Sequence, residues 1–247
     1  MTTTTRLLTG VPVSGHRKTA RVVGVLFLIT YVTAIATKLF FYRPLFDNGN
    51  YIVSGVADDL LLWGAFSEVL LVLANIGTAV ALFPLLRRQH EGLALGFVAA
   101  RVVECIFICV GTLAVLTIVT VRQDFSSAGG ADSAGLAPVG NALVALQEWT
   151  FKLGPNLTVG VGNGLILGYL MYRSGLVPRL LAALGLVGGV GICLSGVAVL
   201  FGLTEAGSPL QLAASLPEFL WELILGIYLI TKGFKPSALT TSNFDPR

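Results

Sequence analysis

Charged residues are scarce in this chain, and their scarcity decides the class of protein. Asp, Glu, Lys and Arg make up 12% of the 247 residues, whereas 55% are hydrophobic. Soluble domains carry about 25% charged residues, so this chain has too few to cover a water-facing surface. The composition predicts an integral membrane protein that forms one unit, because no polar stretch is long enough for a second domain.

Histidine and cysteine are also rare, so few side chains could bind a transition metal or take part in redox reactions. His16 and His90 lie in polar segments without neighbouring ligands, so the sequence predicts no metal and no cofactor. The cysteines all lie inside apolar runs, where cysteine typically acts as a small apolar side chain. No nucleotide-binding or GxSxG pattern occurs in a suitable context. A net charge of +3 gives no reason to expect a nucleic-acid partner.

The chain is instead rich in long apolar runs, about six of which are long enough to cross a bilayer. A spanning helix needs roughly 20 residues. The predicted spans are 22–41, 60–86, 93–121, 141–172, 180–203 and 210–231. The expected fold class is therefore an all-α polytopic helical bundle. Its transmembrane domain covers 22–232, between a polar segment at 1–21 and a polar tail at 233–247.

The fourth run is unusually long and contains Gly154-Pro155. Proline removes one helical hydrogen bond and clashes with the preceding turn, so we expect this helix to be broken near Pro155. Backbone groups freed at membrane depth must be shielded by protein or water. Glycine-rich stretches at 160–164 and 185–189 are interpreted as sites of close helix packing.

Basic residues are distributed unevenly between the two ends of the predicted spans. An even number of crossings places both termini on one side, and that side holds most of the Lys and Arg residues. Only Lys38, Arg43 and Arg122 fall on the other side. Lys and Arg concentrate in cytoplasmic segments, which predicts cytoplasmic termini, a location in the cytoplasmic membrane and the lipid bilayer as a partner.

Apart from Lys38, which is assigned to the external side, seven charged residues fall inside the predicted spans. A charge at mid-bilayer costs about 2.5–3.5 kcal/mol on insertion scales, so such residues normally face a bundle interior or a cavity. Six of them form pairs three or four residues apart, which places each pair on one helical face. The pairs are Arg101 with Glu104, Glu148 with Lys152, and Glu218 with Glu222; Glu68 is the seventh residue.

The depth of these residues predicts a polar cavity that opens to the outside. Glu68 lies about 12 Å from the external side at 1.5 Å per residue, and Glu218 also falls in the external half. The candidate catalytic residues are Glu68, Glu104, Glu218, Glu222 and Arg101. The candidate substrate-binding residues are Asn75, Trp63, Trp149, Trp221, Asn156 and Asn163.

Most of these features also have a structural interpretation. Arg101 with Glu104 fits a tie between helices, and Glu148 with Lys152 fits a snorkelling pair near the boundary. Asparagines commonly bridge helices, and tryptophans commonly form an interfacial belt. Glu218 and Glu222 are harder to explain in this way, because like charges gain nothing from proximity. We therefore expect one of them to hold a proton at neutral pH.

Three motifs, two of them long, resemble a known bacterial family. The segment Tyr172-Arg-Ser-Gly-Leu-Val-Pro-Arg179, leading into Leu-Ala-Ala-Leu-Gly-Leu-Val-Gly188, is similar to a hallmark of domain-of-unknown-function family 4386. Glu222-Leu-Ile-Leu-Gly-Ile-Tyr-Leu-Ile-Thr-Lys-Gly-Phe234 and Arg101-x-x-Glu104 are similar to it as well. The resemblance covers nearly the whole chain. It implies a multi-helix integral membrane protein, common in actinobacteria, and brings no activity with it.

Three functions remain open from the sequence. The first is an intramembrane enzyme that transfers a proton from Glu218 or Glu222 to an apolar or amphiphilic small-molecule substrate, such as an isoprenoid or lipid. Membrane-bound terpene cyclases are an analogy of size and acid placement. The second is a small proton-coupled transporter that works as a homodimer, with Pro155 as its hinge. The third is a non-catalytic accessory or binding subunit whose buried charges are structural.

Overall fold

The computed structural model describes residues 13–47, 51–54, 58–127 and 133–236, which are helical with short turns and no strand. The predicted polar segments 1–21 and 233–247 lie largely outside these ranges, so their boundaries stay a prediction. In chain order the elements, with η for π-helix, are α1 (Val13–Ala36), η1 (Thr37–Phe41), α2 (Arg43–Asp47), α3 (Tyr51–Ser54), α4 (Asp58–Leu86), α5 (Glu91–Ser127), α6 (Ser133–Leu153), η2 (Gly154–Thr158), η3 (Gly160–Leu167), α7 (Gly168–Ser174), α8 (Arg179–Leu200) and α9 (Pro209–Thr231).

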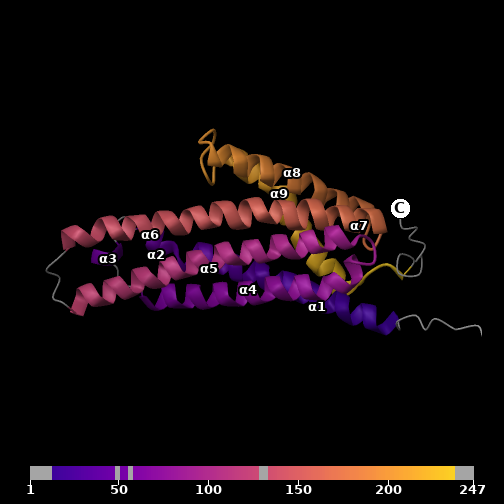
Figure 1. The fold of residues 1–247 in the computed structure, drawn as a ribbon, viewed down its shortest axis with the longest axis horizontal. Helices are drawn as coiled ribbons and strands as arrows, with labels where there is room; N and C mark the ends of the chain where they lie inside the picture. The colour runs from indigo at the N-terminus through magenta and orange to yellow at the C-terminus, as the bar shows by residue number, and fades with distance from the viewer. Residues whose placement is uncertain (1–12, 48–50, 55–57, 128–132, 237–247) are drawn as a thin grey trace, which may run out of the picture.

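Five segments in the described ranges are long and apolar enough to cross a membrane: His16–Asp47, α4, α5, α8 and α9. The chain is therefore an all-α, multi-pass membrane protein (Figure 1). The predicted fourth span is not among the five, because it is divided among α6, η2, η3 and α7. These four elements still follow one helical course beside α5. The interruption expected near Pro155 is present as a change from α to π hydrogen bonding after Leu153.

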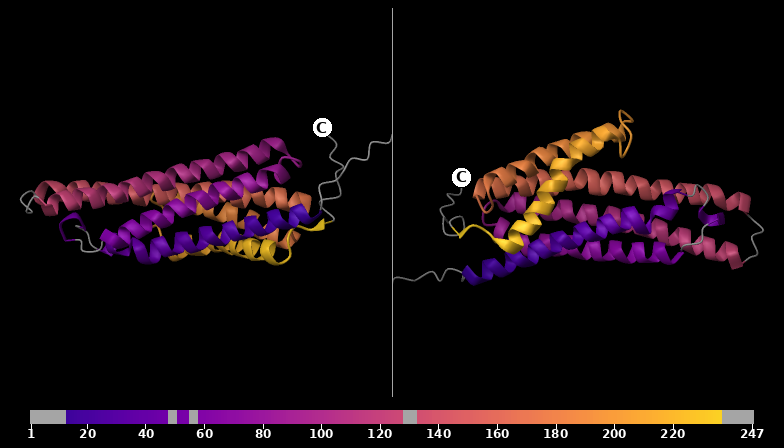
Figure 2. Two further views of the ribbon diagram at one scale, coloured as in Figure 1. Left: turned by 90° about the horizontal axis from the view of Figure 1, so that it is seen from below. Right: turned by 180° about the vertical axis from the view of Figure 1, so that it is seen from behind.

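The helices pack mainly against their neighbours in the chain, and α1 also closes the bundle. It lies between α4 and α9, while α5 contacts both α4 and α6, and α8 packs on α9, α7 and η3. Figure 2 shows α8 and α9 as a hairpin that diverges from the other helices toward its loop. With 37 residues, α5 is about 55 Å long and extends beyond a hydrocarbon core of about 30 Å.

Both described ends of the chain lie at one end of the bundle. The backbone N–H of Lys235 donates to the carbonyl oxygen of Leu176 at 2.9 Å, and Gly233 lies against Ala20 and Arg17 of α1. The turns between α4 and α5 and between α7 and α8 are at the same end (Figure 1). The basic residues that gather there are Arg17, Lys18, Arg21, Arg87, Arg88, Arg173, Arg179, Lys232 and Lys235. This clustering is compatible with the predicted orientation.

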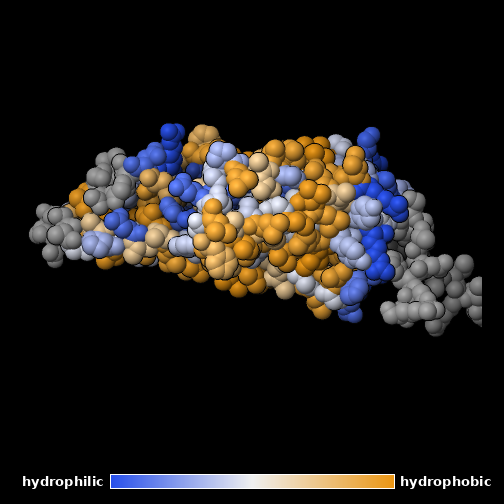
Figure 3. All heavy atoms as spheres, turned by 90° about the horizontal axis from the view of Figure 1, so that it is seen from above, coloured by the Kyte–Doolittle hydropathy of each residue, from blue (hydrophilic) through white to orange (hydrophobic). Residues whose placement is uncertain are grey.

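The outer surface is apolar along the middle of the molecule. Figure 3 shows hydrophobic residues gathered across the middle and hydrophilic residues toward the ends. Val80, Leu113 and Leu194 are 65%, 63% and 67% exposed on three different helices. Apolar patches of this extent are rare on soluble monomers, and lipid chains provide the environment that such a surface requires.

Glycines let α8 approach its neighbours closely. A Cβ atom on Gly188 would lie 2.3 Å from the backbone nitrogen of Glu218, and one on Gly189 would lie 2.8 Å from the carbonyl oxygen of Gly160. The predicted close packing at 160–164 and 185–189 is thus confirmed. Because α8 touches the backbone of α9 at Glu218, this glutamate is held in place by main-chain contact.

Two apolar clusters hold the bundle at different levels. One contains Phe27, Phe97 and Trp221 and lies toward the end of the bundle that carries the termini. The other contains Tyr42 and Val115 and lies toward the opposite end. The polar residues of α5 fall between Phe97 and Val115 along that helix, so the polar layer lies between the two apolar clusters.

Candidate functional site

A cavity of about 1190 Å³ lies between α1, α4, α5, α6 and α9. It extends from Arg101 and Glu222 at its deep end to residues 204–207 in the α8–α9 loop. That loop is at the diverging end of the hairpin (Figure 2). The cavity therefore extends away from the end of the bundle that carries the termini. Small-molecule sites typically have about 300–1,000 Å³, so this cavity has room for a lipid-sized ligand.

The structure brings most of the predicted site residues to this cavity. Those that line it are Glu68, Asn75, Arg101, Glu104, Trp149, Asn156, Glu218 and Glu222. Trp63 does not line it: this residue is 60% exposed on the outer face of α4 and packs edge-on against Phe66. Asn163 and Trp221 are fully buried behind the cavity wall.

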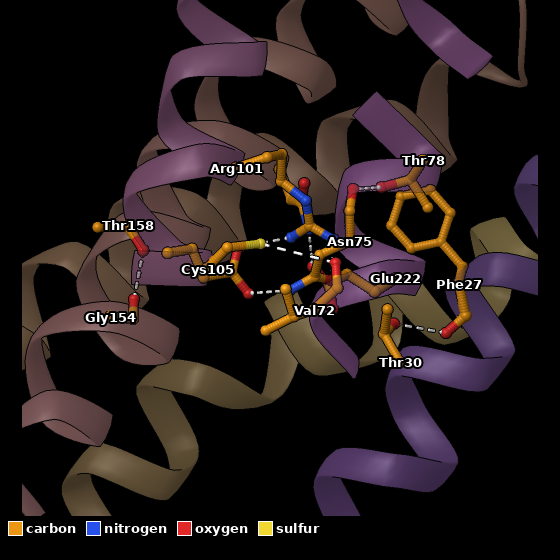
Figure 4. A network of polar contacts seen from close by, with 12 residues as sticks. Phe27, Thr30, Val72, Asn75, Thr78, Arg101, Cys105, Gly154, Thr158 and Glu222 are labelled. Atoms are coloured by element: carbon orange, nitrogen blue, oxygen red, sulfur yellow. Dashed lines mark hydrogen bonds and ion pairs between the residues drawn. The ribbon is translucent and has the colours of Figure 1, made fainter. Parts of the chain in front are cut away.

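The deep end of the cavity holds a closed ring of three side chains, two of which, Arg101 and Asn75, are labelled in Figure 4. Arg101 donates from Nη1 to Oε2 of Glu104 at 2.7 Å and from Nη2 to Oδ1 of Asn75 at 2.6 Å. Asn75 in turn donates from Nδ2 to Oε1 of Glu104 at 3.0 Å. All three residues are at most 4% exposed. The guanidinium charge is therefore matched by Glu104 and fixed in direction by Asn75, which ties α4 to α5.

Glu222 lies beside this ring (Figure 4). Its Oε1 accepts a hydrogen bond from Nδ2 of Asn163, and its carboxyl group is within electrostatic range of Arg101 and Glu104. Asn163 is held by the indole Nε1 of Trp221, which donates to the Asn163 carbonyl oxygen at 3.2 Å. Asn163 and Trp221 thus position Glu222 from behind the cavity wall.

Glu218 is the least compensated of the buried acids that line the cavity. It is 2% exposed, and neither of its carboxyl oxygens has a hydrogen-bond partner among the described residues. A Cβ atom on Gly164 or Gly188 would lie 2.6 or 2.7 Å from its Oε2, so these glycines make the space for the carboxyl group. The deep end thus has three carboxyl groups for one guanidinium. Within the described ranges these acids do not form a metal-binding group.

A second polar group lies farther along the cavity. Oε2 of Glu68 accepts hydrogen bonds from the hydroxyl groups of Tyr42 at 2.8 Å and Thr112 at 2.6 Å. Lys38 lies over the rings of Phe46 and Phe151, 4.0 and 4.8 Å from their centroids. The sequence did not identify Tyr42 or Thr112 as site residues, because nothing in their spacing links them to Glu68.

Removing the Tyr42 hydroxyl tests the anchoring of Glu68. Replacing Tyr42 with phenylalanine is expected to lower the free energy of unfolding by about 1–3 kcal/mol, since a buried carboxyl group loses a hydrogen bond. Denaturant unfolding of the purified protein in detergent measures the change. Tyr169→Phe is the matched control, because that ring is 41% exposed. Equal decreases in the free energy of unfolding for the two variants would show that the hydrogen bond to Glu68 is not stabilising.

The family assignment agrees with this architecture. The sequence profile described as domain of unknown function (DUF4386) matches residues 22–233. No curated protein and no solved structure matches the chain. The two longer motifs come together in the structure, where Leu176, in the turn before α8, accepts a main-chain hydrogen bond from Lys235, the residue directly after Phe234. Since the match covers well over half of the sequence, the chain belongs to the DUF4386 family of domains of unknown function.

Proposed function

We propose that the protein binds an apolar or amphiphilic molecule in the cavity and exchanges a proton with it through Glu218 and Glu222. The observation that carries this proposal is the coincidence of a 1190 Å³ cavity with three carboxyl groups and one guanidinium at its deep end. Ionised acids at this depth are costly. A carboxylic acid kept neutral in an apolar site can donate a proton.

In the enzymatic form of this proposal, the substrate has a carbon–carbon double bond, as isoprenoids and unsaturated lipids do. The O–H bond of Glu218 or Glu222 breaks as a C–H bond forms, which leaves a carboxylate and a carbocation. Loss of a proton from a neighbouring carbon to a carboxylate, such as Glu68, restores a double bond without an oxidant or reductant. Phe219 also lines the cavity, and an aromatic face there would stabilise the developing positive charge.

One observation favours a transporter as the second candidate. Pro155, Asn156 and Val159 line the cavity, and all three lie in or next to the π-helical segments. Irregular helical turns are frequent at functional hinges, and interrupted helices form the binding sites of many transporters. In this form Glu218 and Glu222 would carry protons across the membrane, and two copies would assemble as a homodimer.

The test begins with mass spectrometry of molecules that co-purify with the protein in mild detergent. A single isoprenoid or lipid class is expected, and this molecule then serves as the substrate for assays. Glu218→Gln and Glu222→Gln should each reduce its turnover about 100- to 10,000-fold, the usual contribution of a general acid, with little change in melting temperature. Glu91→Gln, at the start of α5 away from the cavity, is the control.

Other results would redirect the proposal. Substrate-dependent proton flux in liposomes without turnover would identify the transporter. An empty protein whose glutamine variants differ only in stability would identify an accessory subunit with structural charges. Either result would contradict the enzymatic form.

A further inference from the structure

The unpartnered polar atoms of the cavity define which head group a ligand should carry. We propose that the deep end binds the protonated amine of an amphiphilic ligand, and that this amine replaces a proton held by Glu218 and Glu222. The proposal rests on the proposed function in one respect, namely that the cavity is a ligand site. It adds the chemical class of the ligand and the stoichiometry of proton exchange.

Hydrogen-bond acceptors dominate the unsatisfied groups. Among the described residues that line the cavity, the buried atoms without a partner are both carboxyl oxygens of Glu218, Oε1 of Gln147, Oγ1 of Thr37 and Nε of Arg101. An ammonium group supplies three donors and no acceptor, whereas a carboxylate or phosphate supplies acceptors alone. The three carboxyl and amide oxygens therefore match an amine, whereas an anionic head group would find donors only in Nε of Arg101 and the Thr37 hydroxyl.

The charges at the deep end of the cavity also favour a ligand with an amine head group. The guanidinium of Arg101 is already bonded to Glu104 and Asn75, and among the described residues neither Glu218 nor Glu222 forms an ion pair. An anionic ligand would gain no ion pair from these two acids, whether or not they are protonated. A monocation matches one carboxylate and leaves the other to hold a proton.

The only other carboxyl group among the described residues around the two acids is that of Glu104, which is already bonded to Arg101. The titratable side chains within electrostatic range of Glu218 or Glu222 come from α1, α5 and α8: Tyr31, Arg101, Glu104 and Cys193. The Tyr31 hydroxyl donates to the Phe219 carbonyl oxygen. Lys38 interacts instead with Glu148, Lys152 and Glu68 in the other polar group. Proton and ligand therefore compete for the same two carboxyl groups.

The rest of the cavity suits an apolar body. Its wall between the deep end and the α8–α9 loop includes Ile35, Leu71, Ile108, Ile192 and Leu212. A hydrocarbon chain along this wall is buried from water, which favours binding in proportion to the apolar area covered. The ligand is thus a long-chain or otherwise lipophilic amine.

Three probes with one common chain test the head group. The wild-type protein is placed in lipid nanodiscs, and binding of dodecylamine, dodecanol and dodecyltrimethylammonium is measured against empty nanodiscs. Dodecylamine should bind at least about tenfold more tightly than dodecanol, because it adds charge-assisted hydrogen bonds. Dodecyltrimethylammonium, which has charge but no N–H group, should bind more weakly than dodecylamine. Titration calorimetry in buffers of different ionisation enthalpy should detect release of about one proton per bound amine, as competition for the same site requires.

Two glutamine variants and one control complete the test. Glu218→Gln and Glu222→Gln should each remove most of the preference for dodecylamine over dodecanol, whereas Glu91→Gln should keep it. Equal affinity of the two probes in the wild-type protein would overturn the amine assignment while leaving the ligand cavity in place. A preference that survives in both glutamine variants would also overturn it. Failure of every probe to bind would overturn the proposed function as well. The comparison of dodecylamine with dodecanol in the wild-type protein tests the amine assignment even if a variant does not fold.

Discussion

Replacing Glu104 with alanine is expected to lower the free energy of unfolding by about 3–5 kcal/mol, enough to prevent folding of many proteins. The carboxylate is the only acid bonded to Arg101 in the described chain. Without it, a guanidinium that is 2% exposed stays in the middle of the bundle with Asn75 as its remaining partner. The expression level of folded protein and its denaturant unfolding in detergent measure the effect.

Two further variants separate charge from packing. Glu148→Ala removes the ion pair with Lys152, which also spans about one helical turn but is 41% exposed at Glu148 and 22% at Lys152. This loss should lower the free energy of unfolding by only about 0–1 kcal/mol. A double variant, Arg101→Leu with Glu104→Leu, should recover most of the stability, because a buried pair is often replaceable by apolar residues. If Glu104→Ala lowers the free energy of unfolding no more than Glu148→Ala does, the ring of Arg101, Glu104 and Asn75 does not stabilise the fold.

Replacing Gly188 with alanine is expected to cost up to about 3 kcal/mol, the usual upper range for overpacking. The new Cβ atom would lie 2.3 Å from the nitrogen and 2.5 Å from Cα of Glu218. These are backbone atoms, so no side-chain rotation relieves the clash and α8 must move away from α9. The melting temperature in detergent measures the loss.

Gly135 provides the matched control for this substitution. It lies exposed on α6, and a Cβ atom there would meet nothing within 4 Å. Gly135→Ala should therefore stabilise the helix by about 0.5–1 kcal/mol through reduced backbone entropy of the unfolded chain. Opposite signs for the two variants are the expected result. A melting temperature for Gly188→Ala at or above that of the wild-type protein would show that α8 and α9 are not packed at this distance.

The class of fold was predictable because it depends on composition and on the length of apolar runs. Both are properties of short stretches of sequence, as are the pairs Arg101 with Glu104 and Glu218 with Glu222. The close packing of the glycine-rich stretches was predictable for the same reason, since small residues at helical spacing let two membrane helices approach each other closely. The family assignment added no chemistry to these predictions.

The site was predictable only in part, because depth along a helix does not determine which side of the helix faces the cavity. Trp63 and Trp149 were both predicted as substrate-binding residues, yet Trp63 faces outward and Trp149 lines the cavity. The partners of Glu68 were missed for a related reason. Tyr42 and Thr112 come from two other elements, and only the packing of those elements brings their hydroxyl groups to one carboxyl oxygen.

The π-helical stretch after Leu153 explains how one helix presents polar residues in two directions. Asn156 and Asn163 are seven residues apart, a separation that places them on the same face of a regular α-helix. Each π turn accommodates one additional residue, which rotates everything that follows by about 100°. Asn156 therefore lines the cavity, while Asn163 is directed at Glu222 from behind the wall. The π turns rotate the second half of this helix relative to the first. One continuous helix can therefore line the cavity with Asn156 and position Glu222 through Asn163.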